Sequence, residues 1–189
     1  PSTAIFSELT KAKNEWINNV LSEIDRNREE IFPVGYEASK YTILPARDGI
    51  PHGGIERSSI HPNSSFFTNW TSTQDSITWD TDILTAGKYK ATVYYTSKAS
   101  AVGSTLVLKQ GENEINTGIT EAHDSDFLAI EFDRSPRDES FEKDYKPLTI
   151  GIIQLDKGHH PLTMKALEIK GSEFIEVRLL ILERMPGFL

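Results

Sequence analysis

Apolar and polar side chains alternate along residues 77–95, and this period of two constrains the fold more than any other feature of the sequence. Such a period places every second side chain on the same face of a β-strand. Residues 85–88, Thr-Ala-Gly-Lys, interrupt the alternation as a turn does. We therefore expect a β-hairpin with one half-buried face, in which residues 77–83 pair with residues 89–95.

Five further segments have the length and composition of strands, and short turns separate the last three. These segments are residues 104–109, 114–119, 148–155, 162–169 and 174–184. Many strands with short connections and one peripheral helix are typical of an all-β sandwich. The sequence predicts a mainly β fold, a β-sandwich with one N-terminal amphipathic helix.

The predicted helix covers residues 5–28, where apolar side chains recur at spacings of three and four. Pro33 prevents the helix from continuing. We expect two parts, residues 1–36 as the helix and connector, and residues 37–189 as the sandwich.

The last predicted strand has apolar residues on both faces. Ile175, Val177, Leu179 and Ile181 share one face under strict alternation, which leaves Leu180 and Leu182 on the other. We expect the N-terminal helix to cover Leu180 and Leu182.

Composition excludes several classes of protein. Lys and Arg number 20 against 28 Asp and Glu, a formal net charge of −8, which argues against a nucleic-acid partner because phosphate binding normally requires a basic surface. No apolar run approaches the ~18 residues of a membrane span. Cys is absent, which excludes disulfides, thiolate nucleophiles and Cys-ligated zinc. The chain begins at Pro1, which suggests a piece of a longer protein.

Residues 45–75 form a long segment rich in Gly, Ser, Asn and His, and segments of this kind in compact domains are usually functional or disordered. An exposed ring beside planar polar side chains suits a sugar, which stacks on the ring while its hydroxyl groups hydrogen-bond. The candidate carbohydrate-binding residues are Trp70, Asn69, His61, Arg57 and Asp48, together with Arg47. In the alternative interpretation, Phe66, Phe67 and Trp70 fold inward as a lid over one end of the sandwich.

The arginines of this segment extend the hypothesis to sulfated sugars. Arg47 and Arg57 each carry a guanidinium group that can pair bidentately with a sulfate. Asp48 follows Arg47 directly and could instead form a structural ion pair with it.

No enzyme signature is present, so we expect no catalytic residue. The sequence lacks a phosphate-binding Gly-rich loop and a Gly-x-Ser-x-Gly motif. His159 and His160 are adjacent in a turn, and we expect no metal site there. The acidic pairs at 124 and 126 and at 131 and 133 leave a structural calcium ion open as an alternative to no cofactor. Residues 131–144 otherwise suggest a solvated excursion.

Several stretches resemble known families. Residues 77–96, ITWDTDILTAGKYKATVYYT, and residues 155–166, LDKGHHPLTMKA, are similar to jelly-roll carbohydrate-binding modules. Residues 32–36, FPVGY, residues 44–49, LPARDG, and the helix with Trp16 resemble the C-terminal region of bacterial arylsulfatase-type sulfatases. In those enzymes the catalytic domain leads into an appended β-sandwich.

The resemblance implies a non-catalytic C-terminal portion of a sulfatase. Ser135, Pro136 and Arg137 lack the spacing of the sulfatase nucleophile motif, so no catalytic residue is carried over. The implied role is to pack on the parent catalytic domain and to aid binding of a (sulfated) glycan, in a periplasmic or secreted protein. The alternative is a stand-alone carbohydrate-binding or adhesion module with no attached enzyme.

Overall fold

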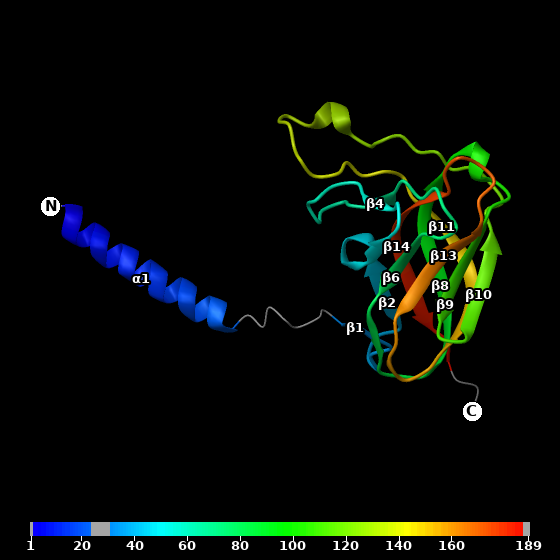
Figure 1. The fold of residues 1–189 in the computed structure, drawn as a ribbon, viewed down its shortest axis with the longest axis horizontal. Helices are drawn as coiled ribbons and strands as arrows, with labels where there is room; N and C mark the ends of the chain where they lie inside the picture. Colours follow the sequence, from blue (N-terminus) through cyan, green and yellow to red (C-terminus); the bar gives the residue numbers. More distant parts are fainter. Residues whose placement is uncertain (1, 24–30, 187–189) are drawn as a thin grey trace. The chain divides into compact units, whose positions relative to one another are not determined.

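The computed structural model describes residues 2–23 and 31–186, and they belong to two compact units, residues 1–30 and 31–189. The first unit contains one helix, α1 (Ser2–Glu23), and the second contains all the strands (Figure 1). The unit boundary lies before residue 31 rather than after residue 36, because Phe32–Val34 already pairs with a strand of the second unit. The predicted helical residues 24–28 lie outside the described residues.

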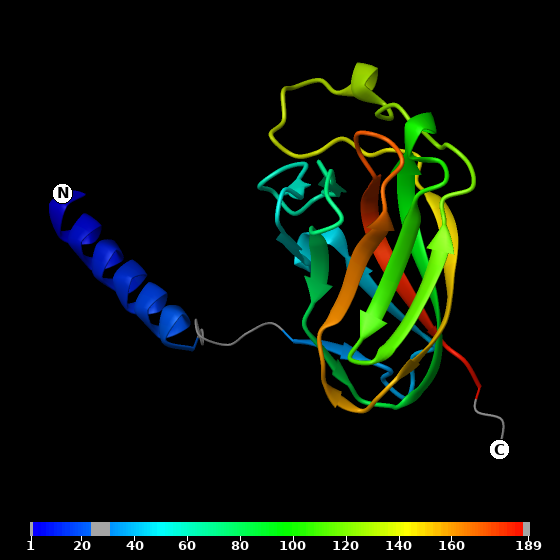
Figure 2. The ribbon, with the colours of Figure 1, turned by 45° about the vertical axis from the view of Figure 1, so that its right-hand side comes forward.

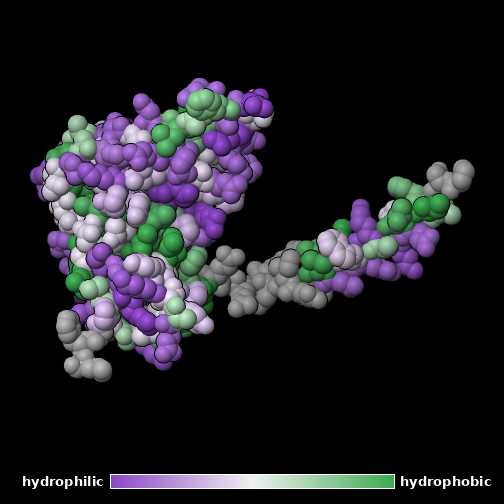
Figure 3. Space-filling model, turned by 180° about the vertical axis from the view of Figure 1, so that it is seen from behind, coloured by the Kyte–Doolittle hydropathy of each residue, from purple (hydrophilic) through white to green (hydrophobic). Residues whose placement is uncertain are grey.

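Helix α1 is amphipathic, as its sequence period predicts. Its exposed apolar side chains form a stripe along one side (Figure 3); they are Ile5, Phe6, Leu9, Trp16, Val20 and Leu21. Within the described residues, no helix combines the length and the hydrophobicity needed to cross a membrane.

The second unit is a jelly-roll β-sandwich of two large sheets with a smaller sheet at one end (Figures 1 and 2). One large sheet has the order β10-β9-β13-β6-β3, formed by Asn113–Gly118, Thr105–Gln110, Leu162–Glu168, Ser76–Trp79 and Ile50–His52. The other has the order β11-β8-β14-β5-β4, formed by Lys146–Leu155, Gly87–Ser97, Ile175–Arg184, Phe67–Thr68 and Glu56–Arg57, and β2 (Tyr41–Pro45) also pairs with β14. The small sheet joins β1 (Phe32–Val34), β7 (Thr81–Ile83) and β12 (Gly158–His159).

The mainly β prediction is confirmed, and each of the five later strands lies within two residues of its predicted range. The predicted hairpin of residues 77–95 is wrong in its pairing. Its alternating side chains are buried as expected, but β6 pairs with β13 and β3 whereas β8 pairs with β11 and β14. The connection between Ile83 and Gly87 therefore leads from β7 in the small sheet to β8 in a large sheet.

A β-bulge decides which side chains of β14 face the core. The register between β14 and β8 shifts between Val177 and Leu179, and an extra residue reverses the facing of all side chains beyond it. Leu180 and Leu182 consequently continue the buried face that Val177 begins, and all three belong to the core of the sandwich. The expectation that Leu180 and Leu182 lie on the opposite face, where the helix covers them, is wrong.

The bulge generates a testable difference between neighbouring residues. We expect Leu180→Ala to lower the free energy of unfolding by about 2–5 kcal/mol, because it leaves a cavity in the core. Ile181→Ala, on the half-buried outer face, should cost clearly less. Urea unfolding of both full-length variants measures the difference, and equal losses would contradict the bulged register.

Candidate functional site

Two long irregular segments meet at one end of the sandwich. The first runs from β2 to β6, and the second is the excursion at residues 120–145, between β10 and β11 (Figures 1 and 2). Hydrogen bonds join them: the Ser58 and Ser140 hydroxyl groups are 2.5 Å apart, the Ser59 hydroxyl donates to the Asp138 carbonyl, and the Asn63 amide donates to Glu139.

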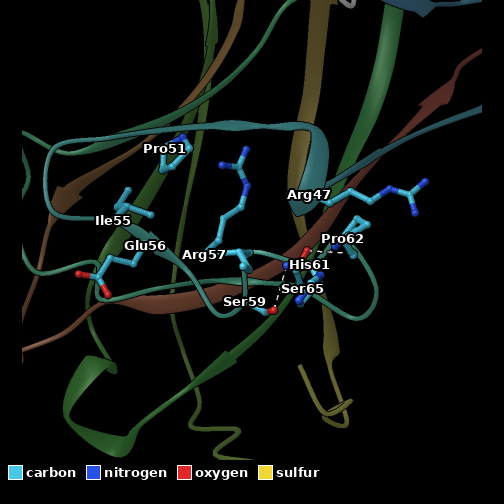
Figure 4. A pocket seen from close by; sticks show the side chains of 10 residues that line it. Arg47, Pro51, Ile55, Glu56, Arg57, Ser59, His61, Pro62 and Ser65 are labelled. Atoms are coloured by element: carbon cyan, nitrogen blue, oxygen red, sulfur yellow. Dashed lines mark hydrogen bonds between the residues drawn. The ribbon is translucent and has the colours of Figure 1, made fainter. Parts of the chain in front are cut away.

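The first segment contains a pocket of about 610 Å³ (Figure 4). Three of the predicted carbohydrate-binding residues, Arg47, Arg57 and His61, line it. The remaining lining residues are Pro51, Ile55, Glu56, Ser59, Ile60, Pro62 and Ser65. The pocket thus combines apolar walls with a few polar groups, as small-molecule sites usually do.

Arg57 is held against the sandwich by two contacts. Its guanidinium donates a hydrogen bond to the Gly49 carbonyl and lies over the Phe67 ring, 5.6 Å from the ring centroid. The backbone at Gly49 is tightly packed as well, because a Cβ atom there would lie 3.0 Å from the Trp79 ring and 3.1 Å from Phe67. Arg57 therefore has a fixed position as part of the pocket wall.

Arg47 lies on the short 3-10 helix η1 (Ala46–Asp48). Its Nε donates to Asp48 Oδ2 at 3.3 Å, and its side chain remains 49% exposed. The structural ion pair between Arg47 and Asp48 is therefore present, and Asp48 does not line the pocket. In Figure 4 the guanidinium of Arg47 points away from that of Arg57.

His61 lies on the connection between β4 and β5, where its backbone N–H donates to the Ser59 hydroxyl at 3.0 Å. A second bond in this connection runs from the Ser65 hydroxyl to the Pro62 carbonyl (Figure 4). These local bonds hold the pocket wall in a defined conformation.

Trp70 does not form part of the pocket. Its ring is fully buried and stands edge-on to Phe174, with ring centroids 5.0 Å apart, and its indole N–H donates to the Ser72 carbonyl. A buried ring cannot stack on a sugar, so this role of Trp70 is wrong. Phe66 and Phe67 are buried too, which confirms the alternative in which all three rings fold inward.

Asn69 is exposed but lies outside the pocket lining. It has a left-handed backbone with φ of 57°, and its side-chain amide donates to the Gly54 carbonyl at 2.8 Å. Asn69 therefore shapes the adjoining turn.

The excursion is anchored to β14 by a partly buried ion pair. The Lys143 ammonium lies 2.6 Å from Glu176, and the two side chains are 12% and 21% exposed. The ammonium also lies over the Phe66 and Phe127 rings. Glu176 accepts a further hydrogen bond from the Thr96 hydroxyl at 2.6 Å. The solvated excursion expected at residues 131–144 is therefore docked at its C-terminal part.

Aromatic residues in the sequence of the excursion indicate this docking, although its acidic composition alone predicts a solvated segment. Phe127, Phe141 and Tyr145 lie in this acidic segment, and the rings of Phe127 and Tyr145 contact Phe66 of the first segment. Burial raises the pKa of the Tyr145 phenol, which keeps this ring neutral.

No three His, Cys, Asp or Glu side chains within residues 2–23 and 31–186 gather as metal ligands would. Of the acidic pairs in the excursion, Asp133 instead forms an ion pair with Arg137, at 3.0 Å. The structural calcium ion stays a prediction.

The fold is similar to that of solved carbohydrate-binding modules. A family 35 carbohydrate-binding module from Clostridium thermocellum superposes with a TM-score of 0.54 at 13% identity, covering 78% of this chain and 100% of that one. A carbohydrate-binding module (CBM6cm-2) from Cellvibrio mixtus lichenase 5A, in complex with cellotriose, gives 0.51 at 11% identity, covering 77% and 98%.

A third similar structure is a longer enzyme. The GH26-CBM35 β-(1,4)-mannanase of Podospora anserina gives a TM-score of 0.55 at 13% identity, covering 79% of this chain but 29% of the mannanase. No protein-family model matches the chain, and none of the curated proteins compared with it is similar in sequence. At these identities the likeness shows the jelly-roll fold shared with carbohydrate-binding modules.

The burial of Trp70 predicts a loss of stability. We expect Trp70→Ala to lower the free energy of unfolding by about 3–5 kcal/mol, as other truncations of buried aromatic residues do. Trp16→Ala provides the matched control, because Trp16 is 65% exposed on α1. Thermal unfolding followed by circular dichroism measures both, and an unchanged melting temperature for Trp70→Ala would place the ring outside the core.

The ion pair of Lys143 predicts a local effect on the pocket wall. Glu176→Gln leaves the ammonium group without its charged partner, which should cost about 1.5–3 kcal/mol. Amide hydrogen exchange should then become faster in residues 57–66 and 138–144. Glu168→Gln is the control, since its pair with Lys170 is about half exposed; the same exchange pattern in both variants would argue against anchoring by Glu176.

Proposed function

We propose that this protein is a non-catalytic carbohydrate-binding domain that takes a glycan in the pocket between β2 and β5. The observation that carries the proposal is the gathering of Arg47, Arg57 and His61 around one cavity on a jelly-roll sandwich. The likeness in fold to carbohydrate-binding modules supports it.

The chemistry of the pocket suits part of a saccharide. Its volume of about 610 Å³ lies within the ~300–1,000 Å³ of typical ligand pockets. The His61 ring can both donate and accept hydrogen bonds, as sugar hydroxyl groups require, and the Ser59 hydroxyl retains one acceptor position. Pro51, Ile55 and Pro62 provide apolar surface for the C–H groups of a sugar ring.

We further propose that the domain is the C-terminal accessory part of a bacterial sulfatase, periplasmic or secreted, and that it packs on the catalytic domain of that enzyme. The sequence resemblance at residues 32–36 and 44–49 supports this parentage. The exposed apolar stripe of α1 supports a neighbouring protein surface, because large exposed apolar patches usually mark interaction sites.

The alternative is a stand-alone carbohydrate-binding or adhesion module. A sulfatase nucleophile motif encoded upstream of Pro1 would favour the accessory role, and an upstream region without one would favour the alternative.

Screening the full chain against sulfated and unsulfated glycans tests the proposal. We expect at least one glycan to bind, and His61→Ala to weaken its binding about tenfold, the effect of losing one or two hydrogen bonds at about 0.5–1.5 kcal/mol each. His159→Ala is the control, because His159 is on β12 and pairs with Asp80 outside the pocket. Isothermal titration calorimetry measures the affinities, and equal losses in both variants would place the ligand elsewhere.

A further inference from the structure

The two arginines of the pocket differ in how far their hydrogen-bonding capacity is already used. Arg57 donates to the Gly49 carbonyl and lies over the Phe67 ring. Arg47 has one contact within the described residues, from Nε to Asp48. The two terminal nitrogens of the Arg47 guanidinium therefore remain available to donate two parallel hydrogen bonds to a ligand.

The contact with Asp48 does not remove Arg47 from use by a ligand. The side chains of the pair are 49% and 24% exposed, and ion pairs between exposed side chains contribute only about 0–1 kcal/mol. Because the pair uses Nε, a second oxyanion can bind the outer edge of the guanidinium without displacing Asp48. A guanidinium fork matches the spacing of two oxygens on a carboxylate or a sulfate.

The negative charge closest to Arg47 is that of its partner Asp48, and the carboxylate that lines the pocket lies away from it. Glu56 is the lining carboxylate, and Figure 4 places it on the opposite side of the pocket from Arg47. On the side of Arg47 lie Pro62 and His61, which add no negative charge (Figure 4).

We propose that Arg47 selects a sugar that carries an oxyanion, either a sulfate ester or a carboxylate, whereas Arg57 shapes the pocket wall. This assignment rests on the proposed glycan-binding function and deepens it. The sugar ring lies against the apolar wall, and its oxyanion accepts two parallel hydrogen bonds from the terminal nitrogens of Arg47. A neutral sugar binds the same pocket without these two bonds.

Calorimetry on the full chain with three matched probes tests the assignment. The probes are carrageenan oligosaccharides, which carry sulfate, the same oligosaccharides after chemical desulfation, and galacturonic acid oligomers, which carry carboxylate. We expect the wild-type protein to bind at least one charged probe about tenfold or more tightly than the desulfated one, because hydrogen bonds to charged groups are the stronger kind. Whichever charged probe shows the preference identifies the oxyanion.

Substitutions at Arg47 should remove the preference for the charged probe and leave the fold and the binding of the neutral probe unchanged. We expect Arg47→Gln to bring the charged and neutral probes within about twofold of each other, and Arg47→Lys to restore part of the preference, because an ammonium keeps the charge without the fork. Arg134→Gln, which removes an equal charge from an exposed position outside the pocket, should change neither affinity. Unfolding curves of each variant exclude a loss of fold.

The outcomes separate the two proposals. A preference for the charged probe that survives in Arg47→Gln overturns the role of Arg47 and leaves glycan binding in place. An equal loss in Arg134→Gln shows long-range charge attraction and likewise overturns it. If the wild-type protein binds the neutral probe more tightly than either charged probe, the role of Arg47 is likewise overturned. If the wild-type protein binds no glycan in the screen and none of these probes, the proposed function itself is overturned.

Discussion

The packing of Trp79 against the turn between β2 and β3 determines where both arginines of the pocket lie. The indole N–H donates to the Pro45 carbonyl at 2.9 Å, and a Cβ atom at Gly49 would lie only 3.0 Å from the ring. Arg47 lies between these two contact points, and Arg57 donates to the Gly49 carbonyl. Since Trp79 is fully buried in β6, the core of the sandwich positions a pocket made of irregular backbone.

The second support of the pocket comes from the opposite end of the sequence. Glu176 on β14 holds Lys143, and the excursion that carries Lys143 contacts the pocket wall where the Asp138 carbonyl accepts the hydrogen bond of Ser59. This ion pair is partly buried and has additional hydrogen bonds, so it favours one arrangement of the two segments, while the desolvation of both charges offsets part of their attraction. The wall of the pocket is therefore enclosed between the sandwich on one side and the docked excursion on the other.

The fold and the pocket contribute different parts of the functional argument. Jelly-roll sandwiches serve many functions, so the fold alone does not assign one. The proposed function depends on which polar groups line the pocket. Arg57 is already bonded to the sandwich, whereas the terminal nitrogens of Arg47 are available, so Arg47 adds a preference for a sugar that carries an oxyanion. Helix α1, described as a unit of its own, adds an exposed apolar stripe that the glycan-binding pocket does not explain.

The sequence by itself determined the strands, because alternation is local: the buried residues of β6, β7 and β8 follow directly from their period of two. It also indicated the segment that contains the pocket and three of its lining residues, since Gly, Pro and polar residues in a long connection resist regular structure. Strand pairing, the bulge in β14 and the burial of Trp70 were decided only in the tertiary structure. Each depends on a partner distant in the sequence, as Trp70 does on Phe174, and no local pattern records such a partner.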